Sequence, residues 1–430
     1  MRRHFLTVAL LTSVAAFTTP AVAADLGGDC CADLEERISE LEATTVRKGN
    51  RKVSVAISGW VAEQVMFWDD GTESNVYVTG LGTTLSSHFK LTGSAQIAPG
   101  WQAGYVVHIE ANAADPLAVD QDRDDALLTG TTHNLQTYWY LSSEKYGKVS
   151  VGLVSQASDN TAILVDGSGS LVPANWVIFD NVSFKLRDGA GNFINVGGAD
   201  LRWADVAMCH HIDAGIGADC NGVPLNAVRY DSPTFGGFSV SASWGEDDFW
   251  DVAVRYAGEF NGVKVAIAGA YSNSTEGLGD TGLGGGHESD YYQIGAYVQH
   301  TPTGLFLYGA YGREENEHRT ANLGLAIPDS DFYYLKAGLR RKFHPLGHTV
   351  LFGEYGQHDD MMSQALIEDG VTGTEMQRWG LGIVQEIDAA AMSLFLVYRN
   401  IEGDIDNLGG AVNVDLDELQ IVKFGALINF

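Results

Sequence analysis

Basic residues, prolines and cysteines are scarce in this chain of 430 residues. It has 26 Lys and Arg against 55 Asp and Glu, a formal net charge of −29. Because nucleic acids need a basic surface to neutralise their phosphates, we expect no nucleic-acid partner. Only 9 prolines accompany 51 glycines, and no Pro-rich linker divides the chain. This composition favours one domain with many turns.

Long apolar runs are also missing after the N-terminus. Glycines and charges interrupt every later stretch well before the roughly 18 apolar residues that a membrane-spanning helix needs. At the N-terminus, Arg2 and Arg3 precede an apolar run, and Ala21, Val22 and Ala23 follow it. This pattern predicts a signal peptide over residues 1–23 and export of the protein. An exported chain that enters a membrane without apolar helices must form a closed β-barrel.

The four cysteines are Cys30, Cys31, Cys209 and Cys220. In an exported protein the second two are predicted to form a disulfide that closes a loop. The sequence Cys209-His210-His211 suggests a metal site as an alternative, but its spacing matches no common ligand pattern. We therefore predict a disulfide, no metal and no cofactor.

Residues 24–52 have a different pattern from the rest of the chain. Leu34, Ile38 and Leu41 recur at spacings of three and four, with charged residues between them. This predicts a short amphipathic helix. Two interpretations remain open: a solvated helix that packs on its own chain, or a small coiled coil between subunits.

From residue 53 to 430 the pattern becomes strand, turn, strand and long loop. In residues 88–110 apolar and polar residues alternate over about ten residues on each side of the turn at 98–100, the length and period of a membrane-spanning β-strand. Further short turns are predicted near 143–147, 232–237, 259–262, 301–304, 343–347 and 388–390. Adding a first strand near 53–67 and a last near 418–430 predicts a sixteen-stranded antiparallel barrel.

Aromatic residues recur near the predicted strand ends, where one ring edge can meet lipid and the other water. We predict that they form a membrane girdle: Trp68, Trp101, Trp139, Trp244, Trp250, Tyr292, Tyr311, Trp379 and Tyr398. The last strand alternates up to Phe430. A terminal Phe on such a strand resembles the signal that is read by the outer-membrane assembly machinery, so we expect that machinery and outer-membrane lipid as partners.

If the apolar positions face lipid, the opposite positions line the lumen. An unpaired charge facing lipid is costly, whereas water in a lumen solvates it, so these charges indicate a water-filled channel. The predicted basic wall consists of Lys90, Arg229, Arg255, Lys264, Lys336, Arg340, Arg378, Arg399 and Lys423. Acidic candidates on strands include Glu110 and Glu354.

The longest connection, residues 156–224, is too long for an idle hairpin loop. We expect its first part to fold into the barrel and narrow the pore, which would place acidic groups across from the basic wall. The acidic candidates in this connection are Asp159, Asp166, Asp180 and Asp188. The alternative is an external loop that covers the mouth.

Several stretches resemble the trimeric sixteen-stranded general porins of Gram-negative bacteria, in particular an alphaproteobacterial type. The likeness is carried by Arg229-Tyr230-Asp231-Ser232-Pro233, Ser142-Ser143-Glu144-Lys145-Tyr146-Gly147, Phe352-Gly353-Glu354-Tyr355-Gly356, Trp379-Gly380-Leu381-Gly382 and Asp29-Cys30-Cys31-Ala32-Asp33-Leu34. It implies homotrimers in the outer membrane, no catalysis and an in-folded third loop. The compact acidic third-loop motif of enterobacterial porins is missing, which leaves the constriction aspartate undefined.

Passive diffusion of small hydrophilic solutes and ions is the function that these features favour. An enzyme is disfavoured because no Gly-x-Ser-x-Gly elbow or convincing histidine partner is present. A substrate-specific channel for sugars or dicarboxylates is the closer alternative, since sugar channels line the lumen with aromatic rings. The inward positions here carry Tyr138, Tyr140, Tyr291, Tyr297, Phe306, Tyr308, Tyr334 and Phe395. Packing against the in-folded loop explains these rings equally well.

Overall fold

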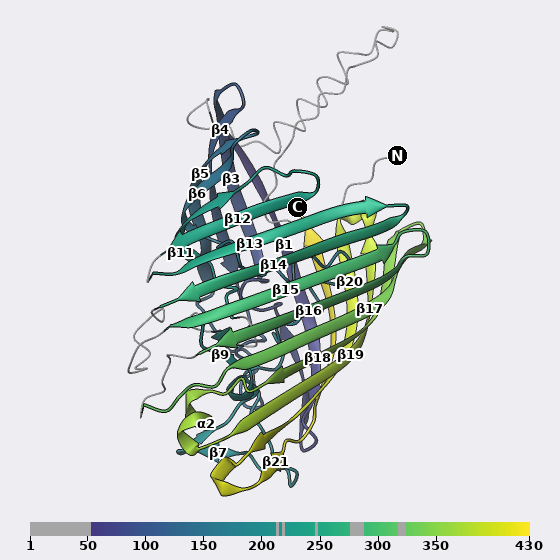
Figure 1. The fold of residues 1–430 in the computed structure, drawn as a ribbon. Coiled ribbons are helices and arrows are strands. Elements are labelled where there is room, and N and C mark those ends of the chain that lie inside the picture. The colour runs from purple at the N-terminus through teal and green to yellow at the C-terminus, as the bar shows by residue number, and fades with distance from the viewer. Residues whose placement is uncertain (1–52, 212–214, 217–219, 246–247, 276–287, 317–323) are drawn as a thin grey trace.

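In the computed structural model the chain forms a closed antiparallel β-barrel (Figure 1). The structure describes residues 53–211, 215–216, 220–245, 248–275, 288–316 and 324–430. The expected signal peptide and the helix within 24–52 lie outside these residues. The barrel closes because β1 (Ser54–Asp69) pairs along one edge with β22 (Leu419–Asn429) and along the other with β3 (Ser87–Ala98).

The barrel sheet contains 18 hydrogen-bonded strands, two of which are short extensions. The first, β2 (Ser74–Thr79), pairs with residues 64–69 of β1, and β3 pairs with residues 54–60 of the same strand. Together β2 and β3 therefore fill one strand position in the wall. Similarly, β21 (Asn413–Asp415) pairs with the end of β20 ahead of β22. Sixteen positions remain, which confirms the predicted strand number. The other strands are β4 (Trp101–Ala111), β5 (Thr132–Ser143), β6 (Gly147–Val154), β11 (Leu225–Asp231), β12 (Phe238–Gly245), β13 (Trp250–Phe260), β14 (Val263–Ser274), β15 (Ser289–His300), β16 (Leu305–Glu315), β17 (Ser330–His344), β18 (Gly347–Asp359), β19 (Gly373–Ile387) and β20 (Met392–Asp406).

All seven predicted short turns join neighbouring strands at one end of the barrel. Two depend on glycine: Gly147 and Gly304 have φ of +86° and +81°, and a Cβ on either would lie 2.2 Å from a backbone oxygen of the adjacent strand. The long connections lie at the other end, with α2 (Gln364–Asp369) and β21 at the bottom of Figure 1. This asymmetry is typical of outer-membrane barrels.

The outer face of the barrel is apolar, and exposed aromatic rings lie near the strand ends. Trp101, Trp139 and Trp244 are exposed there, as the girdle prediction expects. Trp68 is a correction, because it is 1% exposed and packs inside the barrel against Tyr77 and Phe184. The alternation of β1 explains this: odd-numbered residues face outward, and Trp68 is even-numbered.

Residues 155–224, hereafter the lumen segment, connect β6 to β11. Their short elements are β7 (Asn195–Val196), β8 (Ala199–Asp200), the 3₁₀ turn η1 (Trp203–Val206), β9 (Met208–Cys209) and β10 (Gly215–Ile216). Two further 3₁₀ turns, η2 (Asp388–Ala390) and η3 (Leu408–Gly410), flank β20. Among the described residues, no helix has the length and apolarity needed to cross a membrane.

Candidate functional site: the inner wall and the lumen segment

The lumen segment crosses the inner face of successive barrel strands. On β13, Asp251 Oδ2 accepts hydrogen bonds from the backbone N–H and the hydroxyl of Ser158, both at 2.6 Å. Ala162 donates its N–H to Gln293 of β15 at 2.8 Å, and its carbonyl accepts from the Tyr308 hydroxyl of β16 at 2.9 Å. The first part of the segment is therefore fixed to inward-facing side chains.

Lys336 of β17 is the next contact along the wall. Its side chain is 0% exposed, and its ammonium lies 2.5 Å from Asp166 and donates to the carbonyl of Ala174 at 2.7 Å. Tyr308, Tyr334 and Phe352 surround the ammonium with ring centroids 5.5–6.0 Å away. A buried lysine requires such partners, and residues 166–174 supply two of them.

Asp180 is the centre of a second buried network. Its Oδ2 accepts from Arg399 Nη1 at 2.5 Å and from Lys423 Nζ at 2.6 Å. Arg399 also donates to Glu354 at 2.7 Å. Next to them, Arg378 donates to the carbonyls of Asn175 and Val177. Cations on β19, β20 and β22 thus hold residues 175–180 against the wall.

Burial alone would raise the pKa of Asp180, but Lys423 and Arg399 more than offset this and hold that pKa below its usual value. Asp180 therefore stays ionised at neutral pH. A small cavity borders this network and is lined in part by Gln64, Pro173 and Asp180.

Apolar side chains seal the same part of the wall. Ala174, Val177 and Ile178 are buried in one cluster with wall residues such as Tyr334 and Val350. Most of the inward aromatic rings considered for sugar binding are buried in this cluster, namely Tyr291, Tyr297, Phe306, Tyr308, Tyr334 and Phe395. Tyr138 is buried in a separate cluster with Val106, Val154 and Ala227. We call the inner faces of β16–β22 the covered wall.

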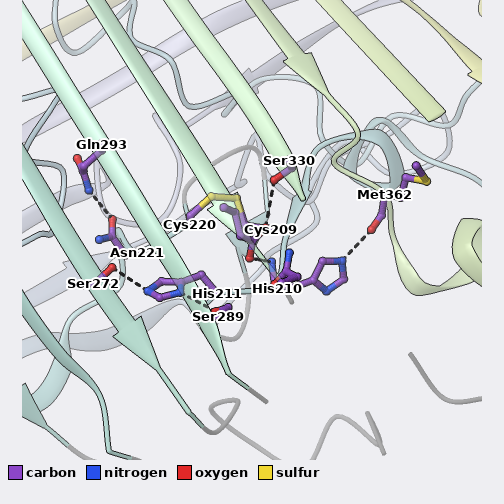
Figure 2. The surroundings of a disulfide bond; sticks show 12 residues. Cys209, His210, His211, Cys220, Asn221, Ser272, Ser289, Gln293, Ser330 and Met362 are labelled. Carbon is purple, nitrogen blue, oxygen red and sulfur yellow. Dashed lines mark hydrogen bonds between the residues drawn. A yellow bond between two sulfur atoms is a disulfide. The ribbon is translucent and has the colours of Figure 1, made fainter. Parts of the chain in front are cut away.

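A disulfide between Cys209 and Cys220 closes the far end of the lumen segment (Figure 2). Next to it, His211 lies between two hydroxyls, with Nδ1 2.7 Å from Ser289 Oγ and Nε2 2.7 Å from Ser272 Oγ. Asn221 accepts from Gln293 at 3.2 Å. The bridge therefore holds a loop that is attached to β14 and β15.

The inner faces of β3–β6, which we call the open wall, differ from the covered wall. Lys90 and Lys148 are half-buried there, and Lys148 lies 3.6 Å from Asp231 at the adjoining edge of β11. Asp231 also pairs with Arg229 at 2.7 Å. Lysines of this wall reach the lumen.

The remaining predicted residues occupy varied positions. Arg255 is half-buried and donates to the carbonyl of Ala157 at 2.6 Å. Lys264 and Arg340 are half-buried near the short turns, and Arg340 pairs with Glu386 at 2.8 Å. The acidic candidates Asp159 and Glu110 are both buried.

Asp188 lies apart from the basic wall. It caps a turn at residues 188–192 by accepting N–H groups from Ala190 and Asn192. Hydrogen bonds from the backbone and side chain of Asn192 and from the backbone of Ala190 lower the pKa of Asp188. Asp166 and Asp180 were expected to face the basic wall across the pore, and in the structure they contact cations of that wall directly. Buried cations at short range compensate their charges: Lys336 for Asp166, and Arg399 and Lys423 for Asp180.

Among the described residues, two groups of side chains have potential metal-ligand atoms within 4.8 Å of one another. In the first, Cys209 and Cys220 approach Glu314, but the cysteines are joined to each other and offer no thiolates. The second group, His88, His108 and Glu110 on the open wall, was not predicted from the sequence. The signal was present: hairpin register about the turn at 98–100 places His88 directly opposite Glu110.

A closed barrel of sixteen antiparallel strands, apolar outside and charged inside, defines an outer-membrane channel. The chain belongs to the Gram-negative porin family, whose model matches residues 9–406. It is an outer-membrane porin and forms a channel for passive diffusion. No curated protein sequence matches the chain significantly.

Several solved structures have a similar fold at low sequence identity. The anion-selective porin from Comamonas acidovorans is 17% identical, with a TM-score of 0.54 over 88% of this chain and 100% of its own. OmpF of Salmonella typhi, in complex with daunomycin, is 12% identical, with a TM-score of 0.52 over 90% and 100%. The trimer form of OmpT from Vibrio cholerae is 12% identical, with a TM-score of 0.52 over 88% and 99%.

Proposed function

We propose that this porin is a general diffusion channel for small hydrophilic solutes and ions, and that the lumen segment narrows its bore. The observation that carries the proposal is the contact of Asp166 and Asp180 with Lys336, Arg399 and Lys423. These ion pairs hold residues 166–180 along the covered wall, where the backbone takes up space that water would otherwise fill.

The charge that solutes meet differs from the total charge of the wall. Lys336, Arg378, Arg399 and Lys423 are buried under the lumen segment. Lys90 and Lys148 are half-buried on the open wall. We therefore assign the electrostatic influence on passing ions mainly to the open wall, because buried and paired charges contribute little field to the lumen.

A sugar-specific channel receives less support from the same contacts. Stacking of a sugar requires accessible ring faces, and Tyr308 and Tyr334 are both 0% exposed beneath the lumen segment. Tyr140 is half-buried on the open wall. Linear uptake of small sugars without saturation is expected, and saturable block of ion current by a sugar would contradict it. We also propose that the protein catalyses no reaction on its solutes.

The channel is proposed to be a homotrimer, as the trimer form of Vibrio OmpT is. Glu63 supports a protein contact on β1, because it faces outward between Val61 and Val65. A carboxylate facing lipid is unfavourable, and a subunit interface would shield it. Light scattering of the detergent-solubilised protein tests this, and a monomeric mass would contradict it.

Removal of residues 160–190 tests the constriction. We expect single-channel conductance in planar bilayers to rise, because the bore gains the volume of the deleted backbone. Asp188→Asn is the control, since the Asp188 carboxylate caps the turn at residues 188–192 and leaves the ion pairs of Asp166 and Asp180 intact, and its conductance should stay unchanged. Heat-modifiable migration on gels checks that both variants fold. A folded deletion variant with unchanged conductance would contradict the constriction.

A further inference from the structure

A cluster of three histidines and one glutamate lies on the open wall, towards the end with the long connections. His88 comes from β3, His108 and Glu110 from β4, and His133 from β5. Strand pairing brings them together: Glu110 is opposite His88 on one side and opposite His133 on the other. Ligand atoms of His88, His108 and Glu110 all lie within 4.8 Å of one another.

Several polar atoms of this cluster are buried without a partner. His108 is 2% exposed, and within the described part of the chain neither of its ring nitrogens has a hydrogen-bond partner. Glu110 is 0% exposed, and its Oε1 is unpaired in the same sense. Buried polar atoms are nearly always paired, and each unpaired one costs about 1–3 kcal/mol. Lone pairs of His108 and Glu110 that lie close together without a hydrogen-bond partner point to a bound cation.

Neighbouring groups hold these side chains in the form that binds a metal. His88 Nδ1 lies 3.0 Å from the carbonyl of Ser86. A carbonyl only accepts, so Nδ1 carries the proton and the lone pair of neutral His88 is on Nε2. Glu110 Oε2 accepts the N–H of Thr84 at 3.0 Å. Metal-binding histidines and carboxylates in proteins have this kind of support.

His133 extends the group. Its Nε2 lies 3.1 Å from Glu110 Oε2, yet the two do not form an aligned hydrogen bond. Its Nδ1 lies 3.2 Å from Thr129 Oγ1, which orients the ring. Two ligand atoms on a tetrahedral zinc ion with bonds of about 2.0–2.1 Å are separated by roughly 3.3 Å. The spacing between His133 and Glu110 therefore fits neighbouring ligands on one ion, although His133 lies outside the set of three residues whose ligand atoms are all within 4.8 Å of one another.

We propose that His88, His108 and Glu110 bind one divalent transition-metal ion of the zinc class, and that the partly exposed His133 completes the site by turning its ring towards the ion. Imidazole nitrogens with a single carboxylate suit Zn²⁺, Ni²⁺ or Cu²⁺, whereas Ca²⁺ and Mg²⁺ prefer sets of oxygen ligands. The side chain of His133 is 21% exposed, which gives the ion a route from solvent. Once bound, the ion joins β3, β4 and β5 of the open wall.

Lys90 allows an independent test of whether the cluster binds a positively charged ion. It lies opposite His108 in the β3–β4 pairing and on the same inner face. Its positive charge repels a bound dication, so Lys90→Met should increase the affinity for metal severalfold. A structural histidine cluster that binds no ion would not respond in this way.

The experiment is a calorimetric titration of the tag-free, chelator-treated full-length porin with ZnCl₂, supported by the absorption spectrum of bound Co²⁺. We expect one ion per chain and a tetrahedral Co²⁺ spectrum. His108→Gln should weaken Zn²⁺ binding at least tenfold. His133→Gln, at the partly exposed position, provides the test if the His108 variant does not fold.

The matched control is His358→Gln, since His358 is another buried histidine on the inner wall and stacks on Phe332 outside the cluster. It should bind Zn²⁺ like the unchanged protein. Absence of Zn²⁺ binding to the folded porin would overturn the proposal. So would equal affinity in the His133→Gln and His358→Gln variants.

Discussion

The covered wall and the open wall differ in what their cations do. Lys336, Arg399 and Lys423 lie beneath the lumen segment, and each is paired with an aspartate of that segment. Lys90 and Lys148 point from the other wall into the lumen and are half-buried. Basic residues on the inner face therefore have two roles in this barrel. One set attaches the lumen segment, and the other set faces solutes.

The same substitution should have very different effects at Asp180, which pairs with the covered wall, and at Asp231, which lies beside the open wall. Asp180 and Asp231 each contact two cations, but their side chains are 2% and 20% exposed. Asp180→Asn leaves Arg399 and Lys423 with buried, uncompensated charge, so we expect a loss of about 3–5 kcal/mol in the free energy of unfolding. Asp231→Asn should lose less, about 1–2 kcal/mol, because Asp231 and Lys148 are each 20% exposed and Arg229 keeps its hydrogen bonds to the carbonyls of Ser155 and Gln156. Urea unfolding in detergent measures both, and equal losses would abolish the distinction between the walls.

Removal of the disulfide should have the next largest effect. Cys209 and Cys220 are 11 residues apart, and a loop of this size contributes about 3 kcal/mol through the unfolded chain. The double variant Cys209→Ser/Cys220→Ser should lose this amount in urea unfolding. Reducing agent should destabilise the unchanged porin and leave the double variant unaffected. If both proteins respond alike, the bridge does not stabilise the lumen segment.

Acid should release the lumen segment from the covered wall. The pKa of Asp180 is lowered in the folded protein, so its ionised form stabilises the fold above the pKa of the unfolded chain. This stability is lost as pH falls through the lower, folded value. We expect conductance to be steady from about pH 7 to pH 5 and to change below about pH 4. The acid transition should be smaller in Asp180→Asn, and an identical transition would assign it to other groups.

The smallest effect concerns ion selectivity on the open wall. Lys90→Gln removes a half-buried lumen charge, so the reversal potential under a salt gradient should move by a few millivolts towards cation preference. Lys145→Gln is the control, because Lys145 lies on the short turn between β5 and β6. Measurement in the presence of a chelator excludes metal bound at the adjacent histidines. An equal shift in both variants would mean that the open wall does not set the local field.

The barrel could be predicted from the sequence because its signals are local. Alternation of period two fixes which side chains face outward, and short turns fix which strands are neighbours. Hence the strand number and all seven short turns agree with the structure. Trp68 was assigned wrongly because closeness to a strand end was considered without its parity along β1.

The site was harder to predict because it depends on contacts between distant parts of the chain. Asp180 meets Lys423 across 243 residues, and no local pattern indicates which of several loop aspartates makes this contact. For the same reason the sequence suggested acids across the pore, whereas the structure has them on the wall. The histidine cluster lies between these cases: the hairpin register relates His88 to Glu110, but His133 follows a long connection.

The pairing of Asp180 with Lys423 also bears on the order of assembly. Lys423 lies on β22, the last strand of the chain, whereas Asp180 follows only the fifth strand position in the wall. During synthesis and insertion the lumen segment is therefore made long before its attachment exists. Until β22 closes the barrel against β1, Asp180 lacks one of its two cations. Completion of the pore lining thus depends on the final step of barrel closure.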